Sequence, residues 1–263
     1  MYKEVILLSY FPMSFKNSIV YRSSVIFSII GSIIWMLISM ALWTFVYQHD
    51  AAQIHYMITY VILSQIIGMF YSGGMSDAIA GKVHSGDFAL DLIRPVNFIV
   101  IEYGRLLGTI CSSILLRGIP IVLVFSPILI RNAQFHSVGY IACAVLAVIL
   151  SHFLYIVIYS LIGFMAFTLF EVWPFNRLMN DTIRLLSGSF IPLALFPDWL
   201  GGIANVLPFR FMYSFPIELM IGDVQPTEIG QNFAILVLWL VGLGALLMLT
   251  YKRSINRCIV QGG

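Results

Sequence analysis

The sequence is poor in charged residues. Lys and Arg number 14 and Asp and Glu number 12 among 263 residues, so that 10% of the chain is charged, whereas a soluble domain typically carries about 25%. Hydrophobic residues make up 60% of the chain. This shortage of charge, together with apolar runs longer than about 20 residues, excludes an ordinary soluble domain and predicts an integral membrane protein.

Other absences exclude further classes. A net charge of +2 with scattered basic residues offers no surface for nucleic acid. The apolar runs do not alternate with polar residues, as the strands of an outer-membrane barrel would. Cys111, Cys143 and Cys258 lack the spacing of metal ligands, so we expect neither a metal site nor a disulfide framework. The five histidines form no His-Glu-x-x-His set, which argues against an intramembrane metalloenzyme.

The apolar segments predict an all-α membrane fold with six transmembrane helices in one domain over 1–263. Residues 1–22 mix apolar and charged side chains around Pro12 and predict a helix lying in the membrane interface. The N-terminus lacks the pattern of a cleaved signal peptide, so we expect the first span to remain as an uncleaved anchor. The expected spans are 25–47, 54–71, 104–130, 138–170, 182–196 and 233–251.

Basic residues are unevenly divided between the two sides of this topology. If the N-terminus is cytoplasmic, eleven of them lie inside, only Arg131 and Arg210 lie outside, and Arg117 falls within a span. Because Lys and Arg are enriched in cytoplasmic loops, both termini are expected in the cytoplasm. The eleven inner residues are Lys3, Lys16, Arg22, Lys82, Arg94, Arg105, Arg177, Arg184, Lys252, Arg253 and Arg257.

The polar stretch 76–96 between the second and third spans is expected to contain a short cytoplasmic helix. Asp87 is a suitable N-cap, and Pro95 disfavours the helical conformation at Arg94. The helix would have about two turns with an exposed apolar stripe, which favours docking to a soluble partner. The membrane surface could cover the same stripe, or the segment could be a simple connector. The stripe comprises Phe88, Leu90 and Leu92, Ile93 is a further apolar position, and the charges are Asp91 and Arg94.

Residues 197–226 are too rich in proline for one helix and too apolar for a free loop. Their aromatic side chains favour the level of the lipid headgroups. We expect two short re-entrant helices here, at about 198–205 and 211–221, on the extracellular side between the fifth and sixth spans. Such backbone must be buried in protein or line a cavity.

Three stretches together resemble permeases of type-2 ATP-binding-cassette (ABC) exporters. They are Gly-Asp-Phe-Ala-Leu-Asp-Leu-Ile-Arg-Pro-Val-Asn at 86–97, Leu-Ser-Gly-Ser-Phe-Ile-Pro-Leu-Ala-Leu-Phe-Pro-Asp-Trp at 186–199 and Leu-Pro-Phe-Arg at 207–210. The chain is most similar to the compact six-span permeases of multidrug, daunorubicin and viologen exporters.

This resemblance implies a coupling helix in the cytoplasm and a place in the cytoplasmic membrane of a bacterium. It also implies two separate ATPase subunits, which carry ATP and Mg, and a second permease subunit, identical or homologous. The chain has no Gly-x-x-x-x-Gly-Lys-Ser/Thr phosphate loop of its own, so we expect no cofactor on it and no enzymatic activity. The expected ATPase contacts are Asp87, Phe88, Leu90, Asp91, Leu92, Arg94 and Pro95.

Two polar residues within spans are candidates for the translocation path. Arg117 near a bilayer midplane could contact an anionic or polar substrate or a second subunit, or it could pair with an acidic or carbonyl group in its own subunit; both remain open. His152 shares a helical face with Tyr155 and Tyr159, which could form a proton relay or a packed helix contact.

The leading hypothesis is therefore an exporter permease driven by ATP on a partner chain. The alternative is a self-contained secondary transporter or channel. Coupling to an ion gradient usually needs acidic residues at the midplane, and the acidic residues here cluster at the expected membrane edges.

Overall fold

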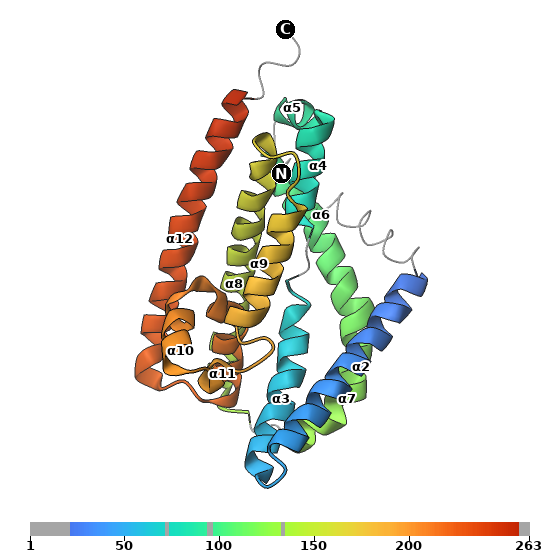
Figure 1. The fold of residues 1–263 in the computed structure, drawn as a ribbon, viewed down its shortest axis with the longest axis vertical. Coiled ribbons are helices and arrows are strands. Elements are labelled where there is room, and N and C mark those ends of the chain that lie inside the picture. Colours follow the sequence, from blue (N-terminus) through green and yellow to red (C-terminus); the bar gives the residue numbers. More distant parts are fainter. Residues whose placement is uncertain (1–21, 72–73, 94–96, 133–134, 258–263) are drawn as a thin grey trace.

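The computed structural model describes residues 22–71, 74–93, 97–132 and 135–257, which are 85% helical and contain no strand (Figure 1). Apart from Arg22, the expected interfacial helix over 1–22 lies outside the described residues. The α-helices are α2 Arg22–Val46, α3 Ala51–Gly68, α4 Met75–Ser85, α5 Asp87–Leu92, α6 Phe98–Ser113, α7 Ile119–Asn132, α8 Val138–Phe164, α9 Trp173–Leu186, α10 Asp198–Val206, α11 Ser214–Ile221 and α12 Pro226–Arg257. A π-helix, η1 Ile114–Gly118, joins α6 to α7, and the 3₁₀ segments are η2 Met165–Phe167, η3 Leu193–Leu195 and η4 Pro208–Met212.

Four helical stretches among the described residues are long and apolar enough to cross a membrane. They are Ser23–Val46, Phe98–Asn132, Val138–Phe167 and Pro226–Asn256. The second of them is continuous through α6, η1 and α7. The expectation of an all-helical membrane protein is therefore confirmed at this level.

The expected span over 182–196 is wrong in its boundaries. The helix there is α9, which begins at Trp173 and ends at Leu186, and only η3 is helical between Ser187 and Phe196. Pro174 stands in the first turn of α9, where a missing backbone N–H is tolerated and φ is already helical. The Trp-Pro pair therefore begins a helix.

The core is built around α8. Its buried residues belong to one apolar cluster that also receives side chains from α4, α11 and α12, and Figure 1 shows α8 between α12 on one side and α4 and α9 on the other. A second, smaller cluster joins α2, α3 and α7 through Met36, Met40, Ile62, Ile121 and Phe125. The molecule thus has two packed groups of helices, with α3 and α9 facing one another between them.

The non-helical backbone after α9 is held by hydrogen bonds from neighbouring helices. The Tyr60 hydroxyl donates to the Gly188 carbonyl oxygen at 2.8 Å, and the Ser64 hydroxyl donates to that of Ser189 at 2.8 Å. The Tyr71 hydroxyl donates to the Met212 carbonyl oxygen at 2.7 Å. Irregular backbone in an apolar setting needs such internal partners. Helices form close to the positions expected within 197–226, as α10 and α11.

Helices α4 and α8 approach most closely at Gly163. A Cβ atom there would lie 2.8 Å from the Cβ of Ile79 and 3.0 Å from the carbonyl oxygen of Ser76. Because both neighbours are fixed by backbone, Gly163→Ala is expected to lower the free energy of unfolding by about 1–3 kcal/mol. Thermal unfolding in detergent, followed by tryptophan fluorescence, measures this change.

Gly139→Ala is the matched control for Gly163→Ala. Gly139 lies in the first turn of the same helix, and its added Cβ would meet nothing closer than the Ser137 hydroxyl oxygen at 3.8 Å. Alanine has the higher helix propensity, so this variant should be neutral or slightly stabilised. Equal stability of the two variants would show that the α4–α8 contact is looser than the structure indicates.

Candidate functional site

Two features of the fold bear on function: the α4–α5 unit (residues 75–92) at one end of the molecule, and a cavity between the two helix groups. Helices α4 and α5 are separated by Gly86, whose φ of +79° belongs to the left-handed region. That conformation ends α4 and turns the chain directly into α5. The expected role of Asp87 as N-cap is wrong, because Gly86 takes that position and the Asp87 carboxylate instead accepts from the Ser85 hydroxyl at 2.9 Å.

Helix α5 is shorter than expected and shows a different face to solvent. It ends at Leu92, and Arg94 and Pro95 lie outside the described residues. Phe88 and Asp91 are 1% and 3% exposed, whereas Leu90 and Ile93 are 61% and 81% exposed. Residues three apart share a helix face, so Phe88 and Asp91 point inward together and Leu90 and Ile93 point outward. The expectation of Phe88 in an exposed stripe and of Asp91 as a surface charge is therefore wrong.

Phe88 anchors α5 to three other parts of the fold. Its ring makes edge contacts with Phe98 of α6 at 5.0 Å, Phe167 of η2 at 5.2 Å and Tyr251 of α12 at 6.4 Å between centroids. Such edge-to-face pairs add to the gain from burying the ring itself. Helix α5 is thus fixed to segments that are far apart in sequence.

A buried group of charges fixes the same unit to α6. Lys82 of α4 forms an ion pair with Asp91 of α5 and another with Glu102 of α6, at 3.1 Å. Glu102 also accepts from Arg105 at 3.0 Å. The Asp91 and Glu102 side chains are 3% exposed, so the shared cation offsets the desolvation of both carboxylates.

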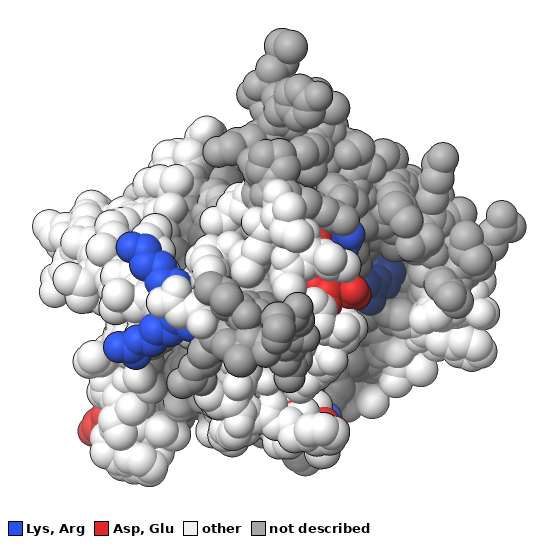
Figure 2. All heavy atoms as spheres, turned by 90° about the horizontal axis from the view of Figure 1, so that it is seen from above, with Lys and Arg blue, Asp and Glu red and all other residues white. Residues whose placement is uncertain are grey.

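The described residues around the α4–α5 unit do not form one basic patch. Figure 2 views this end of the molecule and shows Lys and Arg in separate places on a described surface that is otherwise mostly uncharged. Near it, Asn176 of α9 donates to Asp77 of α4 at 2.8 Å. The most prominent feature that α5 presents outward is therefore apolar, namely Leu90 and Ile93.

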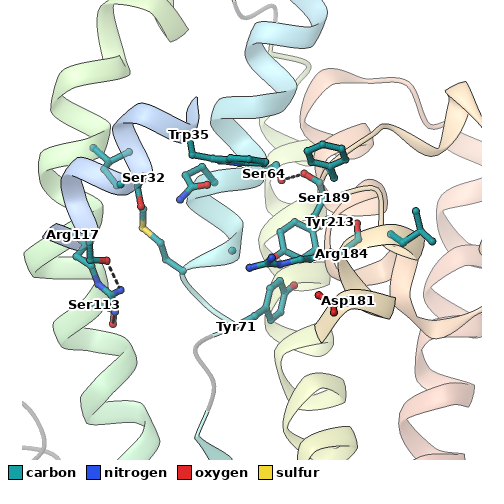
Figure 3. Close-up of a pocket in the computed structure, with 18 residues that line it drawn as sticks. Ser32, Trp35, Ser64, Tyr71, Ser113, Arg117, Asp181, Arg184, Ser189 and Tyr213 are labelled. Atoms are coloured by element: carbon teal, nitrogen blue, oxygen red, sulfur yellow. Dashed lines mark hydrogen bonds between the residues drawn. The ribbon is translucent and has the colours of Figure 1, made fainter. Parts of the chain in front are cut away.

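The cavity has a volume of about 880 Å³ and lies between α2, α3, η1 and α9 (Figure 3). We call it the Arg117 cavity. It is lined by Ser28, Gly31, Ser32, Trp35, Ser64, Gln65, Gly68, Met69, Tyr71, Ser113, Arg117, Ile121, Asp181, Arg184, Leu185, Ser189, Phe190 and Tyr213. Its size is typical of sites for drug-sized ligands.

Arg117 projects from η1, the π-helical turn in the middle of the helix over Phe98–Asn132. Single π-turns occur frequently at functional sites. Its guanidinium donates to the hydroxyls of Ser28, at 3.0 Å, and Ser113. Its partners among the described residues are therefore hydroxyls, not the acidic or carbonyl group that the sequence suggested, and contact with a substrate or a second subunit stays a prediction.

His152 does not line the Arg117 cavity. Its Nδ1 atom is 2.9 Å from the carbonyl oxygen of Phe70, and its ring lies 5.8 Å from that of Tyr103. The rings of Tyr155 and Tyr159 lie 4.3 Å apart between centroids with their planes tilted by 34°, and the Tyr159 hydroxyl donates to Oδ1 of Asn180. These contacts are those of a packed, hydrogen-bonded helix interface.

Sequence reasoning did not single out several residues that the structure places at these sites. One of these contacts was predictable. Glu102 and Arg105 are three residues apart at the start of an apolar helix, and this spacing favours the ion pair that they form. Trp35 lies more than a hundred residues from Arg184 and Phe190 in the sequence, and no local pattern could have joined it to them.

Comparison of the sequence with curated proteins gives no match. A family model described as ABC-2 family transporter protein matches residues 49–262, which include the α4–α5 unit and most of the cavity lining. A match over most of the chain identifies the family, and it agrees with the resemblance found in the sequence. The chain belongs to the ABC-2 family of membrane transporter proteins.

Proposed function

We propose that this chain is the transmembrane subunit of an ATP-driven exporter, coupled through α5 to separate ABC ATPase subunits. The complex would contain two ATPases, which bind ATP and Mg, and a second permease that is identical or homologous. The chain itself would carry no enzymatic activity. Membership of the ABC-2 family supports an ABC transporter, and the finer assignment rests on α5.

The observation that carries this proposal is the contrast between the two faces of α5. The inner face is fixed by Phe88 and Asp91, and the outer face shows Leu90 and Ile93 to solvent. An exposed apolar pair on a rigidly held helix at the end of the molecule suits a groove on a soluble partner. The firm inner attachment lets force applied at α5 reach the body of the protein.

The topology that we propose has six crossings with both termini in the cytoplasm. Four long helices account for four crossings, and α3 and α9 would supply the others. Helix α9 has 14 residues, or about 21 Å at 1.5 Å per residue, so the hydrogen-bonded segment 187–196 would complete its crossing. Helix α4, the start of α6 and the end of α12 lie toward one end of the molecule, and the end of α7 lies toward the other (Figure 1). The first three carry Lys82, Arg105 and Lys252, and the last carries Arg131, in the order that the positive-inside rule favours.

The mechanism follows from the path of α6. Closure of the two ATPases on ATP would push on α5, and the Phe88 contacts and the Lys82 ion pairs would pass that motion to the start of α6. The same continuous helix carries Arg117 further along. Displacement of its cytoplasmic end would therefore alter the Arg117 cavity and change its access from one side of the membrane to the other.

The first test is co-purification with an ATPase. The tagged chain is isolated from native membranes in mild detergent, and the ABC ATPases that accompany it are quantified by mass spectrometry. Replacing both Leu90 and Ile93 by Ala should lower their amount by about tenfold or more, since loss of apolar burial worth 1.4 kcal/mol corresponds to tenfold in affinity.

Leu123→Ala with Val124→Ala is the control, because both residues are exposed and apolar but lie on α7, away from α5. This variant should retain the ATPase. If no ABC ATPase accompanies the unmodified chain, or if the α5 variant retains as much as the control does, the coupling proposal is wrong.

A further inference from the structure

The Arg117 cavity contains more positive than negative charge. Arg117 and Arg184 both line it, and Asp181 is its one acidic lining residue among the described residues. Asp181 is already paired, since its carboxylate lies 3.1 Å from Nε of Arg177. Figure 3 shows Arg184 reaching toward the middle of the cavity from α9, with Arg117 on the opposite wall. The two walls therefore supply cations whose charge the cavity lining does not balance.

Arg117 is held by neutral groups. Both of its hydrogen-bond partners are serine hydroxyls, and no carboxylate among the described residues lies within ion-pair distance of it. A smaller cavity of about 180 Å³ on its other side is also rich in hydroxyls, from Ser24, Thr109 and Ser112. A guanidinium in the middle of an apolar helix is costly without a counter-charge. Hydroxyl groups can in addition donate to an anion bound beside them.

The remaining wall of the Arg117 cavity is aromatic. Trp35 of α2 and Phe190, which follows α9, stack at 5.7 Å with an angle of 28° between their planes. Tyr71 and Tyr213 meet at 5.3 Å on the side facing α8. Flat apolar surfaces of this kind bind rings and acyl chains. The cavity thus joins an aromatic surface to two cations.

We propose that the Arg117 cavity binds an amphiphile with an apolar or aromatic body and one acidic group, a carboxylate, phosphate or sulfonate. The acidic group lies against Arg117 and its serine hydroxyls, and the body lies along Trp35 and Phe190. The claim that this ligand is the transported substrate rests on the proposed exporter function. The claim that the cavity binds such a ligand does not. Organic dications such as viologens are disfavoured, because they would face both arginines without a free carboxylate.

Direct binding to the full-length chain in phosphatidylcholine nanodiscs tests the proposal. Three dansyl probes share one ring system: dansylglycine is an anion, dansylglycinamide is neutral and dansyl-ethylenediamine is a cation. Energy transfer from the five tryptophans of the chain to the dansyl group reports binding. Dansylglycine should bind about tenfold or more tightly than the amide, as expected for a charge-assisted hydrogen bond, and the cation should bind most weakly.

Arg117→Gln should reduce the preference for dansylglycine over the amide to about onefold while leaving binding of the amide nearly unchanged. Retained amide binding shows that the variant is folded, and Arg184→Gln provides a second, independent loss of charge. Arg131→Gln, at the exposed end of α7 and outside the cavity, removes the same charge and should keep the full preference. Equal binding of the anionic and neutral probes to the unmodified chain, or a preference that survives Arg117→Gln, would overturn the proposal.

A second set of nanodiscs containing phosphatidylglycerol distinguishes two sources of the same chemistry. Competition with dansylglycine that depends on Arg117 would support an anionic lipid as the natural ligand. Undiminished dansylglycine binding would support a soluble organic anion. No ATPase is present in these measurements, so a failure of ATPase coupling and a failure of ligand binding give separate results.

Discussion

Replacement of Lys82 by Met is expected to lower the free energy of unfolding by about 3 kcal/mol, near the lower end of the range for breaking a buried ion pair. Lys82 supplies the cation that Asp91 and Glu102 share, and both carboxylates are almost fully buried. The loss stays near the lower end because Glu102 keeps Arg105 as a partner. Methionine fills the space of the lysine stem, so the change isolates the charge.

Lys252→Met is the control for this variant. Lys252 is exposed on the last turns of α12, toward the same end of the molecule, and removal of an isolated surface charge usually changes stability by less than about 0.5 kcal/mol. Thermal unfolding of both variants in the same detergent provides the comparison. Equal stability would mean that Lys82, Asp91 and Glu102 are hydrated and that α5 is attached to α6 mainly by Phe88.

A double variant separates the effect of the buried charges from the position of α5. Lys82→Met combined with Asp91→Leu removes both partners of the ion pair between α4 and α5, and a buried ion pair replaced by apolar groups is often nearly neutral in stability. The double variant is therefore expected to recover part of what Lys82→Met loses. It should also retain the ATPase, because Leu90 and Ile93 remain on the outer face of α5.

The sequence was sufficient to predict the class of fold. Charged residues are costly in hydrocarbon, so a chain that crosses the membrane contains few of them. It also located a helix that begins at residue 87, since Gly86 and Asp87 at its start and Pro95 after it limit where a helix can form. It could not say which side of that helix is inward. Phe88 and Leu90 are equally apolar, and only the position of α6, α8 and α12 determines which of them is buried.

The Arg117 cavity illustrates the same limit. Arg117 was recognisable as an unusual charge within an apolar span, but its neighbours Ser28 and Ser113 are ordinary residues until α2 is packed against η1. Arg184 stood out in the sequence as one of the basic residues expected on the inner side. In the structure it lines the cavity together with Asp181, whose carboxylate pairs with Arg177.

Phe88→Ala is expected to lower the free energy of unfolding of the region around α5 by about 3–5 kcal/mol, as for other fully buried phenylalanines. Its ring is 1% exposed and contacts four other rings, those of Phe98, Phe164, Phe167 and Tyr251. Helix α5 has only 6 residues, too few to be stable alone, so without this anchor it should detach. Amide hydrogen exchange over residues 87–92 measures the local opening.

Phe88→Ala should also release the ATPase, and comparison with the Leu90/Ile93 double variant shows why the inner face matters. The double variant removes the exposed contact and should leave exchange at 87–92 slow, whereas Phe88→Ala should make that exchange fast and lose the ATPase together with it. Phe88→Leu refills most of the space and should restore part of both. Slow exchange in Phe88→Ala would mean that the ion pairs alone hold α5, and retention of the ATPase despite fast exchange would mean that coupling does not need a rigid α5.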